Sequence, residues 1–208
     1  MTMRKLTSFE QGVAETILTS AEEHAWEFAA LLEGTGGPEM GMFTSHRADG
    51  VDLSEDVVRL ARAHGAVVVH HNHLSQESLS DDDWRGLIEV YAEAFAHCAD
   101  GTIYWGRAVD REAIAKVIAN GFVELAAINE LNKLIDFHPD YPSIGTFFRK
   151  EVTNRAMRNR GFVEYEYAWG SKTVLPHGAR PGGAPANVWG KQFNVHIDEA
   201  AKILAPTL

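Results

Sequence analysis

Apolar and polar residues alternate along the chain with two different spacings, and these predict helices and strands in turn. Over residues 6–24 the apolar side chains recur near helical spacing, which predicts an amphipathic helix. Residues 27–44 contain two apolar runs on either side of a glycine-rich turn, a pattern typical of a β-hairpin or meander. A serine and two acids at 54–56 open a helix that ends at Gly65, and the β-branched run 67–69 then predicts a buried strand.

The second half of the chain opens with a stripe of apolar residues at helical spacing. The stripe predicts one helix that ends at Cys98 and contains Trp84, Leu87, Ile88, Tyr91, Ala92 and Phe95. The later patterns predict, in order, a strand over 102–105, a long helix over 110–135 that bends or packs closely at Gly121, a helix over 146–160, a strand over 162–167, a loop over 176–187 and a short helix over 198–204. This order of elements indicates an α+β or three-layer α/β fold.

The composition is that of a globular protein, with 45% hydrophobic and 23% charged residues in a chain of 208. The formal net charge of -10, from 19 basic and 29 acidic residues, disfavours binding to nucleic acid phosphates and to anionic membranes. No apolar run approaches the roughly 20 residues that span a bilayer, and the polar start lacks the apolar core of a signal peptide. We therefore expect a cytoplasmic protein, and its single cysteine excludes an internal disulfide.

The predicted buried strand continues into histidines and then into serines and acids, which together suggest a metal site. Because side chains alternate along a strand, His71 and His73 are expected to point to one face and His70 to the other. Ser80 and Asp83 follow where the next helix begins, and the carboxylate supplies a third ligand. Two histidines, one aspartate and an open position suit a catalytic zinc ion, and a site of four cysteines is excluded.

The run His-Asn-His at 71–73, six further residues, Ser80, two residues and Asp83 resembles the JAMM motif of the JAB/MPN metalloprotease family. The spacer is most similar to that of a prokaryotic and phage-associated branch. Leu74 stands where that branch has proline and Gln76 where it has glycine, and both changes bear on the shape of the loop more than on the metal. Serine followed three residues later by an acid is also an ordinary helix start, and the two interpretations are compatible.

The resemblance also implies a fold and a division of the chain. JAB/MPN domains have a central mixed sheet flanked by helices, similar to that of cytidine deaminases, and the resemblance covers residues from about 20 to 135. We therefore expect a JAB/MPN-like core with an N-terminal helix over residues 1–135. Residues 136–208 are expected to form a C-terminal extension of helix and strand with a loop rich in glycine and proline.

The family's motif includes a glutamate upstream of the histidines, and Glu27, at the start of an apolar run that ends in Gly34, is similar to it. This carboxylate is not a ligand: it accepts a proton as the zinc-bound water attacks a carbonyl, and returns the proton to the leaving amine. Glu33 lies on the same strand face as Glu27 by parity, and Glu39 is a further alternative. In the same scheme the Ser80 hydroxyl joins zinc in stabilising the oxyanion.

The resemblance thus implies a Zn²⁺-dependent hydrolase of peptide or isopeptide bonds, whose protein or peptide substrate is a conjugate or precursor of a ubiquitin-like modifier. Two alternatives stay open: an MPN-type interaction scaffold without catalysis, and a DNA-associated protein of the RadC type, against which the acidic charge counts. The basic residues of the predicted helix over 146–160 form either a solvated face or a docking surface for an acidic partner; they are Arg149, Lys150, Arg155, Arg158 and Arg160.

Overall fold

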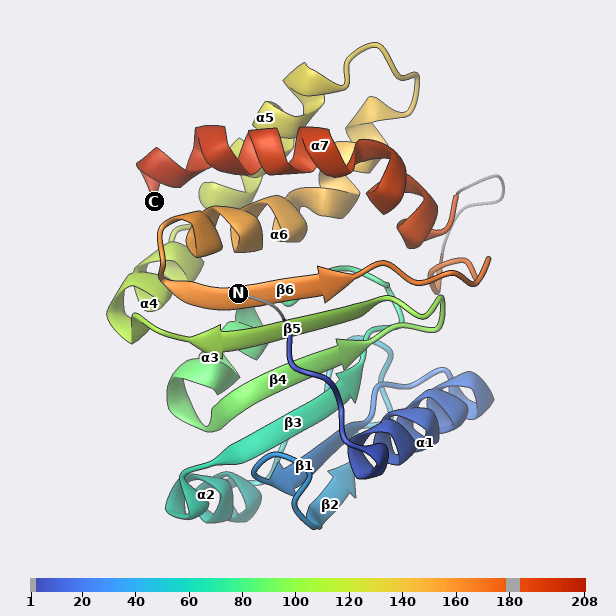
Figure 1. Cartoon of the computed structure of the whole chain (residues 1–208), viewed down its shortest axis with the longest axis vertical. Coiled ribbons are helices and arrows are strands. Elements are labelled where there is room, and N and C mark those ends of the chain that lie inside the picture. Colours follow the sequence, from blue (N-terminus) through green and yellow to red (C-terminus); the bar gives the residue numbers. More distant parts are fainter. Residues whose placement is uncertain (1–2, 179–183) are drawn as a thin grey trace.

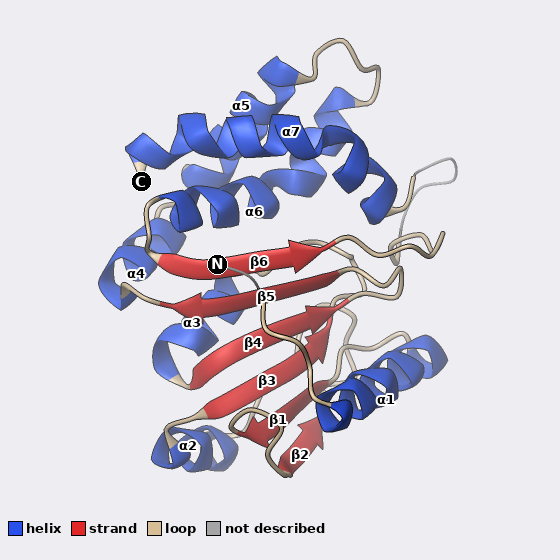
Figure 2. Cartoon of the chain, in the orientation of Figure 1, coloured by secondary structure: helices blue, strands red, loops and turns tan. Residues whose placement is uncertain are grey.

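The computed structural model describes residues 3–178 and 184–208, which fold around one six-stranded sheet (Figure 1, Figure 2). The strands are β1 (Ala29–Glu33), β2 (Glu39–Phe43), β3 (Val67–Asn72), β4 (Tyr91–His97), β5 (Ile103–Ala108) and β6 (Val163–Ala168). Their order across the sheet is β2-β1-β3-β4-β5-β6. β3 and β4 are parallel and the other neighbours are antiparallel, so the sheet is mixed.

Helices flank this sheet on both faces. They are α1 (Ser8–His24), α2 (Glu55–His64), α3 (Asp81–Glu89), α4 (Arg111–Ala119), α5 (Val123–Leu134), α6 (Tyr141–Asn159) and α7 (Ala186–Leu204), and a 3₁₀ turn (Ala205–Thr207) follows α7. α1 covers one face, α3 packs against β4 and β5 on the other, and α5, α6 and α7 pack together beside β6 (Figure 1). The predicted fold class is confirmed at this level: an α+β chain with a mixed central sheet, consistent with a three-layer α/β fold.

The helices lie where amphipathic sequence meets an apolar sheet face. Val13 and Ile17 of α1 pack with Val68 and Phe95 of the sheet in one buried cluster. A larger cluster on the opposite face extends from Ala29 of β1 to residues of α7. No helix among the described residues is long and apolar enough to cross a membrane, and the expected compartment stays a prediction.

The N-terminal half follows the predicted pattern closely. β1 and β2 form the expected hairpin, and α2 begins at the expected serine, since Ser54 Oγ accepts a hydrogen bond from the Val57 backbone N–H at 3.4 Å. Gly65 ends α2 with φ +75°, a left-handed conformation that glycine adopts without steric cost. β3 then begins at Val67, and each of its residues is buried.

The prediction of one helix that ends at Cys98 is wrong beyond its first turns. α3 ends at Glu89, and Tyr91–His97 forms β4, between β3 and β5. A central strand is apolar on both faces, and Ala94, Phe95 and Ala96 are all buried. Its apolar residues therefore form a continuous run without alternation, and such a run also fits the spacing of a helix. Cys98 accordingly follows a strand rather than ending a helix, and it is buried as expected.

The predicted long helix over 110–135 is divided in two. Asn120 leaves the helical conformation with ψ 90°, and its side-chain Oδ1 accepts a hydrogen bond from the Phe122 N–H at 3.2 Å. α4 therefore ends at Ala119 because an asparagine competes with the helix for backbone donors, and Gly121 only follows the break.

The C-terminal segment contributes both sheet and helix. The strand predicted over 162–167 is confirmed as β6, which pairs with β5. α7 is longer than the predicted short helix, because it begins at Ala186; the predicted loop over 176–187 includes residues 179–183, which lie outside the described residues. The division of the chain near residue 135 stays a prediction, although the larger apolar cluster contains side chains from both parts.

The predicted basic surface on α6 is wrong for Arg155. This side chain is fully buried and forms ion pairs with Glu151 at 2.7 Å and with Asp198 at 2.7 Å. Its guanidinium also lies over the ring of Tyr167, 4.0 Å from the centroid. Arg155 therefore connects α6 to α7 instead of presenting charge to solvent.

Candidate metal centre

Three predicted ligands converge at the end of β3. His71 lies within β3, His73 follows its last residue, and Asp83 lies in the first turn of α3. The Nε2 atoms of the two histidines are 2.9 Å apart, and the aspartate oxygens lie 2.9 Å from His71 Nε2 and 3.3 Å from His73 Nε2. One potential ligand atom from each of the three side chains therefore lies within 4.8 Å of the other two.

The start of α3 aims the aspartate. Ser80 caps the helix, and Asp83 Oδ2 accepts hydrogen bonds from the Ser80 N–H at 2.6 Å and from its hydroxyl at 2.7 Å. The other oxygen, Oδ1, lies against His71 Nε2, while Oδ2 lies also against His73 Nε2. Burial acts to raise the pKa of Asp83, but His71 and His73 outweigh it and hold that pKa well below its usual range. The carboxylate is therefore anionic, as a metal ligand must be.

The spacing of the ligand atoms fits a zinc ion. Metal–ligand bonds of about 2.0–2.1 Å in a tetrahedral site place ligand atoms roughly 3.3 Å apart, close to the 2.9 Å between the two Nε2 atoms. With one oxygen of Asp83 included, the three ligand atoms lie within 4.8 Å of one another. Two imidazoles and one carboxylate leave a fourth position for water, the pattern of a catalytic rather than a structural site. His71, His73 and Asp83 are thus close enough together to bind a metal ion.

His73 is oriented for ligation by its second nitrogen. Its Nδ1 lies 2.8 Å from the Glu77 carbonyl oxygen, so Nδ1–H donates to that carbonyl and leaves the lone pair of the neutral ring on Nε2. Burial lowers the pKa of His73, but Asp83 and Glu27 outweigh it and raise the pKa to about 9. His71 differs, because its Nδ1 is buried and has no hydrogen-bond partner among the described residues.

Glu27 lines the same cavity as the triad, a space of about 280 Å³ whose wall also includes Ser80. Burial raises the pKa of Glu27, and His73 and His71 partly oppose that rise. Glu27 lies just before β1 instead of opening it as predicted. Glu33 is the last residue of β1, so the two acids lie at opposite ends of this strand. Glu33 is exposed, ends β1 and lies 3.4 Å from His64, so of these two acids Glu27 is the one at the triad.

Backbone contacts hold Glu27 on both sides. The Glu27 N–H donates to the Arg47 carbonyl at 2.7 Å, and the Thr44 hydroxyl donates to the Glu27 carbonyl at 2.8 Å. Asn72 accepts from the Phe28 N–H at 2.8 Å and donates to the Trp26 carbonyl at 3.3 Å. The asparagine between the two histidines therefore fixes the segment that carries the acid.

Sequence reasoning gave no structural role to Asn72 and Glu77, and it named a third residue, Gln76, only as a change in the loop. Asn72 has a visible signal, because it lies inside the motif, but its contacts depend on a chain segment more than forty residues away. Glu77 acts through its carbonyl, which no side-chain pattern records. Gln76 takes a left-handed conformation with φ +57°, at the position where the similar branch of the family has glycine.

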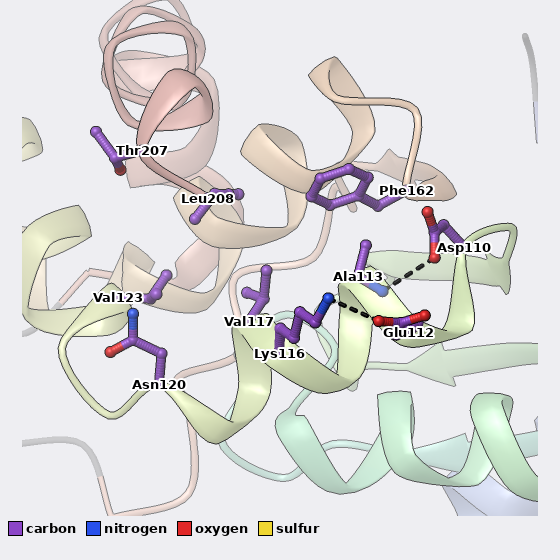
Figure 3. Close-up of a pocket in the computed structure, with 10 residues that line it drawn as sticks. All are labelled: Asp110, Glu112, Ala113, Lys116, Val117, Asn120, Val123, Phe162, Thr207 and Leu208. Carbon is purple, nitrogen blue, oxygen red and sulfur yellow. Dashed lines mark hydrogen bonds and ion pairs between the residues drawn. The ribbon is translucent and has the colours of Figure 1, made fainter.

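Two other cavities lack such a set of groups. One, of about 410 Å³, lies between α4 and the C-terminal residues (Figure 3), and its acids are occupied: Asp110 caps α4 and Glu112 pairs with Lys116. The other, of about 580 Å³, lies between α1 and the segment over 172–177. Among the described residues, His71, His73 and Asp83 are the group whose geometry suits a metal ion.

Comparison of the chain with protein-family models, with curated proteins and with solved structures found no match. The fold and the site therefore define the protein by themselves: a mixed α+β sheet with a candidate metal centre at the end of a central strand. The resemblance to the JAB/MPN family depends on the motif and stays a prediction.

Proposed function

We propose that this protein is a zinc-dependent hydrolase of peptide or isopeptide bonds, of the JAMM type. The observation that supports it is the joint geometry of three ligands and one acid that is not a ligand. His71, His73 and Asp83 converge, and Glu27 lines the same cavity. A purely structural metal site has no need of such an acid, whereas hydrolysis requires a base for the attacking water.

The metal ligands, Glu27 and Ser80 have separate chemical roles. His71, His73 and Asp83 would hold the zinc ion, which would supply a Lewis acid that lowers the pKa of a water molecule toward about 7. Glu27 accepts the proton of this water and passes it to the leaving amine, and its raised pKa favours a carboxylate that can both take and return a proton. The Ser80 hydroxyl contacts the oxyanion in this proposal, although it donates to Asp83 in the resting structure.

The substrate class follows from the reaction and from the resemblance. A protein or peptide with an amide or isopeptide bond is the proposed substrate, and a ubiquitin-like conjugate is the first candidate. Nucleic acid is disfavoured because the net charge of -10 repels phosphates.

The test is zinc content, followed by activity. The wild type, His71→Ala and Glu27→Gln are purified without chelator, and zinc per chain is measured by elemental analysis. We expect about one zinc in the wild type and in Glu27→Gln and none in His71→Ala. Only the wild type is expected to cleave conjugates, because Glu27→Gln keeps the metal and loses the base.

Two results contradict the proposal at different points. If all three proteins stay metal-free after zinc is added at neutral pH, the metal centre is refuted. If Glu27→Gln keeps full hydrolytic activity, the assignment of Glu27 as the base is refuted while the metal centre stands.

A further inference from the structure

The loop that connects the metal ligands, residues 74–79, is bonded to the C-terminal part of the chain at successive positions. The Leu74 carbonyl accepts from the His177 N–H at 2.8 Å, and Gln76 Nε2 donates to the Val174 carbonyl at 3.0 Å. Further along the loop, hydrogen bonds link the Ser78 hydroxyl to Tyr165 at 2.6 Å and the Leu79 carbonyl to Asn154 Nδ2 at 2.9 Å. The loop between the second and third ligand therefore lies against residues 154–177.

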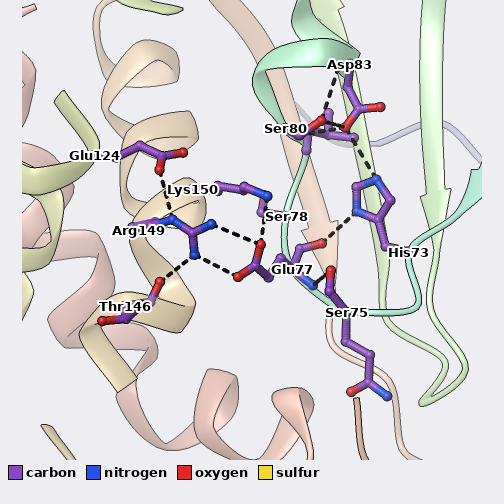
Figure 4. Close-up of polar contacts among 12 residues, drawn as sticks. His73, Ser75, Glu77, Ser78, Ser80, Asp83, Glu124, Thr146, Arg149 and Lys150 are labelled. Carbon is purple, nitrogen blue, oxygen red and sulfur yellow. Dashed lines mark hydrogen bonds and ion pairs between the residues drawn. The ribbon is translucent and has the colours of Figure 1, made fainter. Parts of the chain in front are cut away.

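Within this loop, the backbone carbonyl and the side-chain carboxylate of Glu77 contact different partners (Figure 4). Its carbonyl accepts the Nδ1–H of the ligand His73 at 2.8 Å. Its carboxylate accepts from Arg149 Nη1 at 2.7 Å and from Lys150 Nζ at 2.7 Å, both on α6. Arg149 in turn donates to Glu124 of α5 at 2.8 Å. A chain of contacts thus leads from two helices to the ring of a metal ligand.

These ion pairs are not ordinary surface pairs. The side chains of Glu77, Arg149 and Lys150 are only 17%, 22% and 21% exposed, so solvent screens them weakly. Burial acts to raise the pKa of Glu77, and the two cations outweigh it and lower that pKa. Because the carboxylate is held from two sides, the backbone of residue 77 has little freedom to turn its carbonyl away from His73.

We propose that Arg149 and Lys150 are positioning residues of the metal centre: by holding the Glu77 carboxylate they fix the carbonyl that orients His73. The inference rests on the proposed metal centre and assigns a role to the C-terminal segment, which is to complete that centre. Removing outer partners of a ligating histidine typically weakens metal binding about 10- to 100-fold.

The sign of the effect separates positioning from simple electrostatics. Arg149→Gln with Lys150→Gln removes two positive charges near the site, which by Coulomb attraction alone strengthens the binding of a cation. Positioning predicts the opposite, a zinc affinity about 10-fold weaker or more. The matched control removes the same charge elsewhere, with Lys116→Gln and Lys133→Gln, two exposed lysines whose partners are Glu112 and Glu130.

The experiment measures zinc affinity of the full chain by competition with a chromophoric chelator, and the visible absorption of the cobalt-loaded protein. The melting temperature of each metal-free form reports any general loss of stability. We expect weaker zinc binding and an altered cobalt spectrum in the α6 double variant, and neither change in the control. If the double variant does not fold, Lys150→Gln alone serves, with a smaller loss of about threefold expected from one remaining partner.

Each outcome decides the matter. Unchanged or tighter zinc binding in the α6 variant, with an unchanged cobalt spectrum, overturns the positioning role while leaving the metal centre intact. An equal loss in the control variant also overturns it, because the effect is then one of net charge. Absence of zinc binding by the wild type refutes the metal centre itself, and the positioning role with it.

Discussion

The two faces of β3 present histidines of identical chemistry in different surroundings. On one face His71 and His73 meet Asp83 in a cavity. On the other, His70 lies within 3.0 Å of His97 from β4 and stacks on Phe95, with ring centroids 4.8 Å apart. Burial lowers the pKa of His70 to about 4 and that of His97 well below its ordinary value, whereas the pKa of His73 is raised to about 9.

The difference comes from what each carboxylate already binds. Glu10 lies 3.5 Å from His70 Nε2, but Arg4 donates to Glu10 at 2.9 Å and neutralises it. In the part of the chain that the structure describes, no arginine or lysine pairs with Asp83: Ser80 donates to it, and its other partners are the imidazoles of His71 and His73. A carboxylate free of a competing cation, next to imidazoles and open to a cavity, distinguishes a candidate metal site from a buried polar pair.

The largest effect on zinc affinity should come from replacing a histidine on one face of the sheet and comparing it with the same replacement on the other face. His73→Ala removes a ligand, so we expect zinc affinity to fall on the order of 1,000-fold or more, beyond the effect of an outer partner. His70→Ala leaves the ligands in place and should change zinc affinity less than about threefold, although it destabilises the fold. Zinc titration of both variants checks this, and equal losses in the two would remove the distinction between the faces.

The pH dependence of stability should differ in sign between the two faces in the metal-free protein. The unfolded chain protonates His70 below about 6.5 and the folded chain only near 4, so the free energy of unfolding falls as pH drops through that window, by up to roughly 3 kcal/mol. The contribution of His73 is present below about 6.5 and is lost as pH rises toward 9, by a similar amount. Urea unfolding across pH 4–9 measures both limbs.

Single variants assign these two limbs. His70→Gln should make the acid limb shallower, with the remainder due to His97, whose pKa is also lowered, and His73→Gln should flatten the alkaline limb. A wild-type stability that is constant between pH 6.5 and 9 would mean that Asp83 does not stabilise the charged form of His73.

A smaller effect should follow from the helix cap at the site. Ser80→Ala removes the hydroxyl that caps α3 and bonds Asp83, so we expect a loss of about 1 kcal/mol in stability and a zinc affinity about 10-fold weaker. Ser54→Ala is the matched control, because Ser54 caps α2 in the same way. Ser54→Ala should lower stability by a similar amount and leave zinc binding unchanged. If Ser54→Ala also weakens zinc binding, the weaker binding of Ser80→Ala is explained by lost stability alone.

The smallest effect should come from Gln76. Its left-handed backbone costs about 1–2 kcal/mol, which glycine avoids, but its side chain bonds the Val174 carbonyl at 3.0 Å and the Ala186 N–H at 3.3 Å. Gain and loss nearly cancel, so Gln76→Gly should change the free energy of unfolding by less than about 1 kcal/mol. A loss of several kcal/mol in thermal or urea unfolding would show that the side-chain contacts dominate.

The sequence predicts that His71, His73 and Asp83 lie close together better than it predicts the strands of the sheet. The alternation of side chains along β3 and the helix cap at Ser80 are local features of the sequence. The two histidines were predicted from the first and Asp83 from the second. β4 was missed because a strand buried on both faces has no period of two to distinguish it from a helix. Glu77 and Arg149 were not connected, because seventy-two residues separate an ion pair that only the tertiary fold brings together.

The burial of Cys98 makes the only thiol of the chain a reporter of local opening. The residue is 1% exposed at the end of β4, its N–H donates to the Thr102 carbonyl at 2.9 Å, and burial raises its pKa well above the ordinary value. A thiol reagent can reach it only when this end of the sheet opens, so the labelling rate equals the intrinsic rate multiplied by the fraction of open molecules. His97, the residue before Cys98, accepts a hydrogen bond from the His73 backbone N–H, so the labelling rate of Cys98 reports opening of the sheet beside the candidate metal centre.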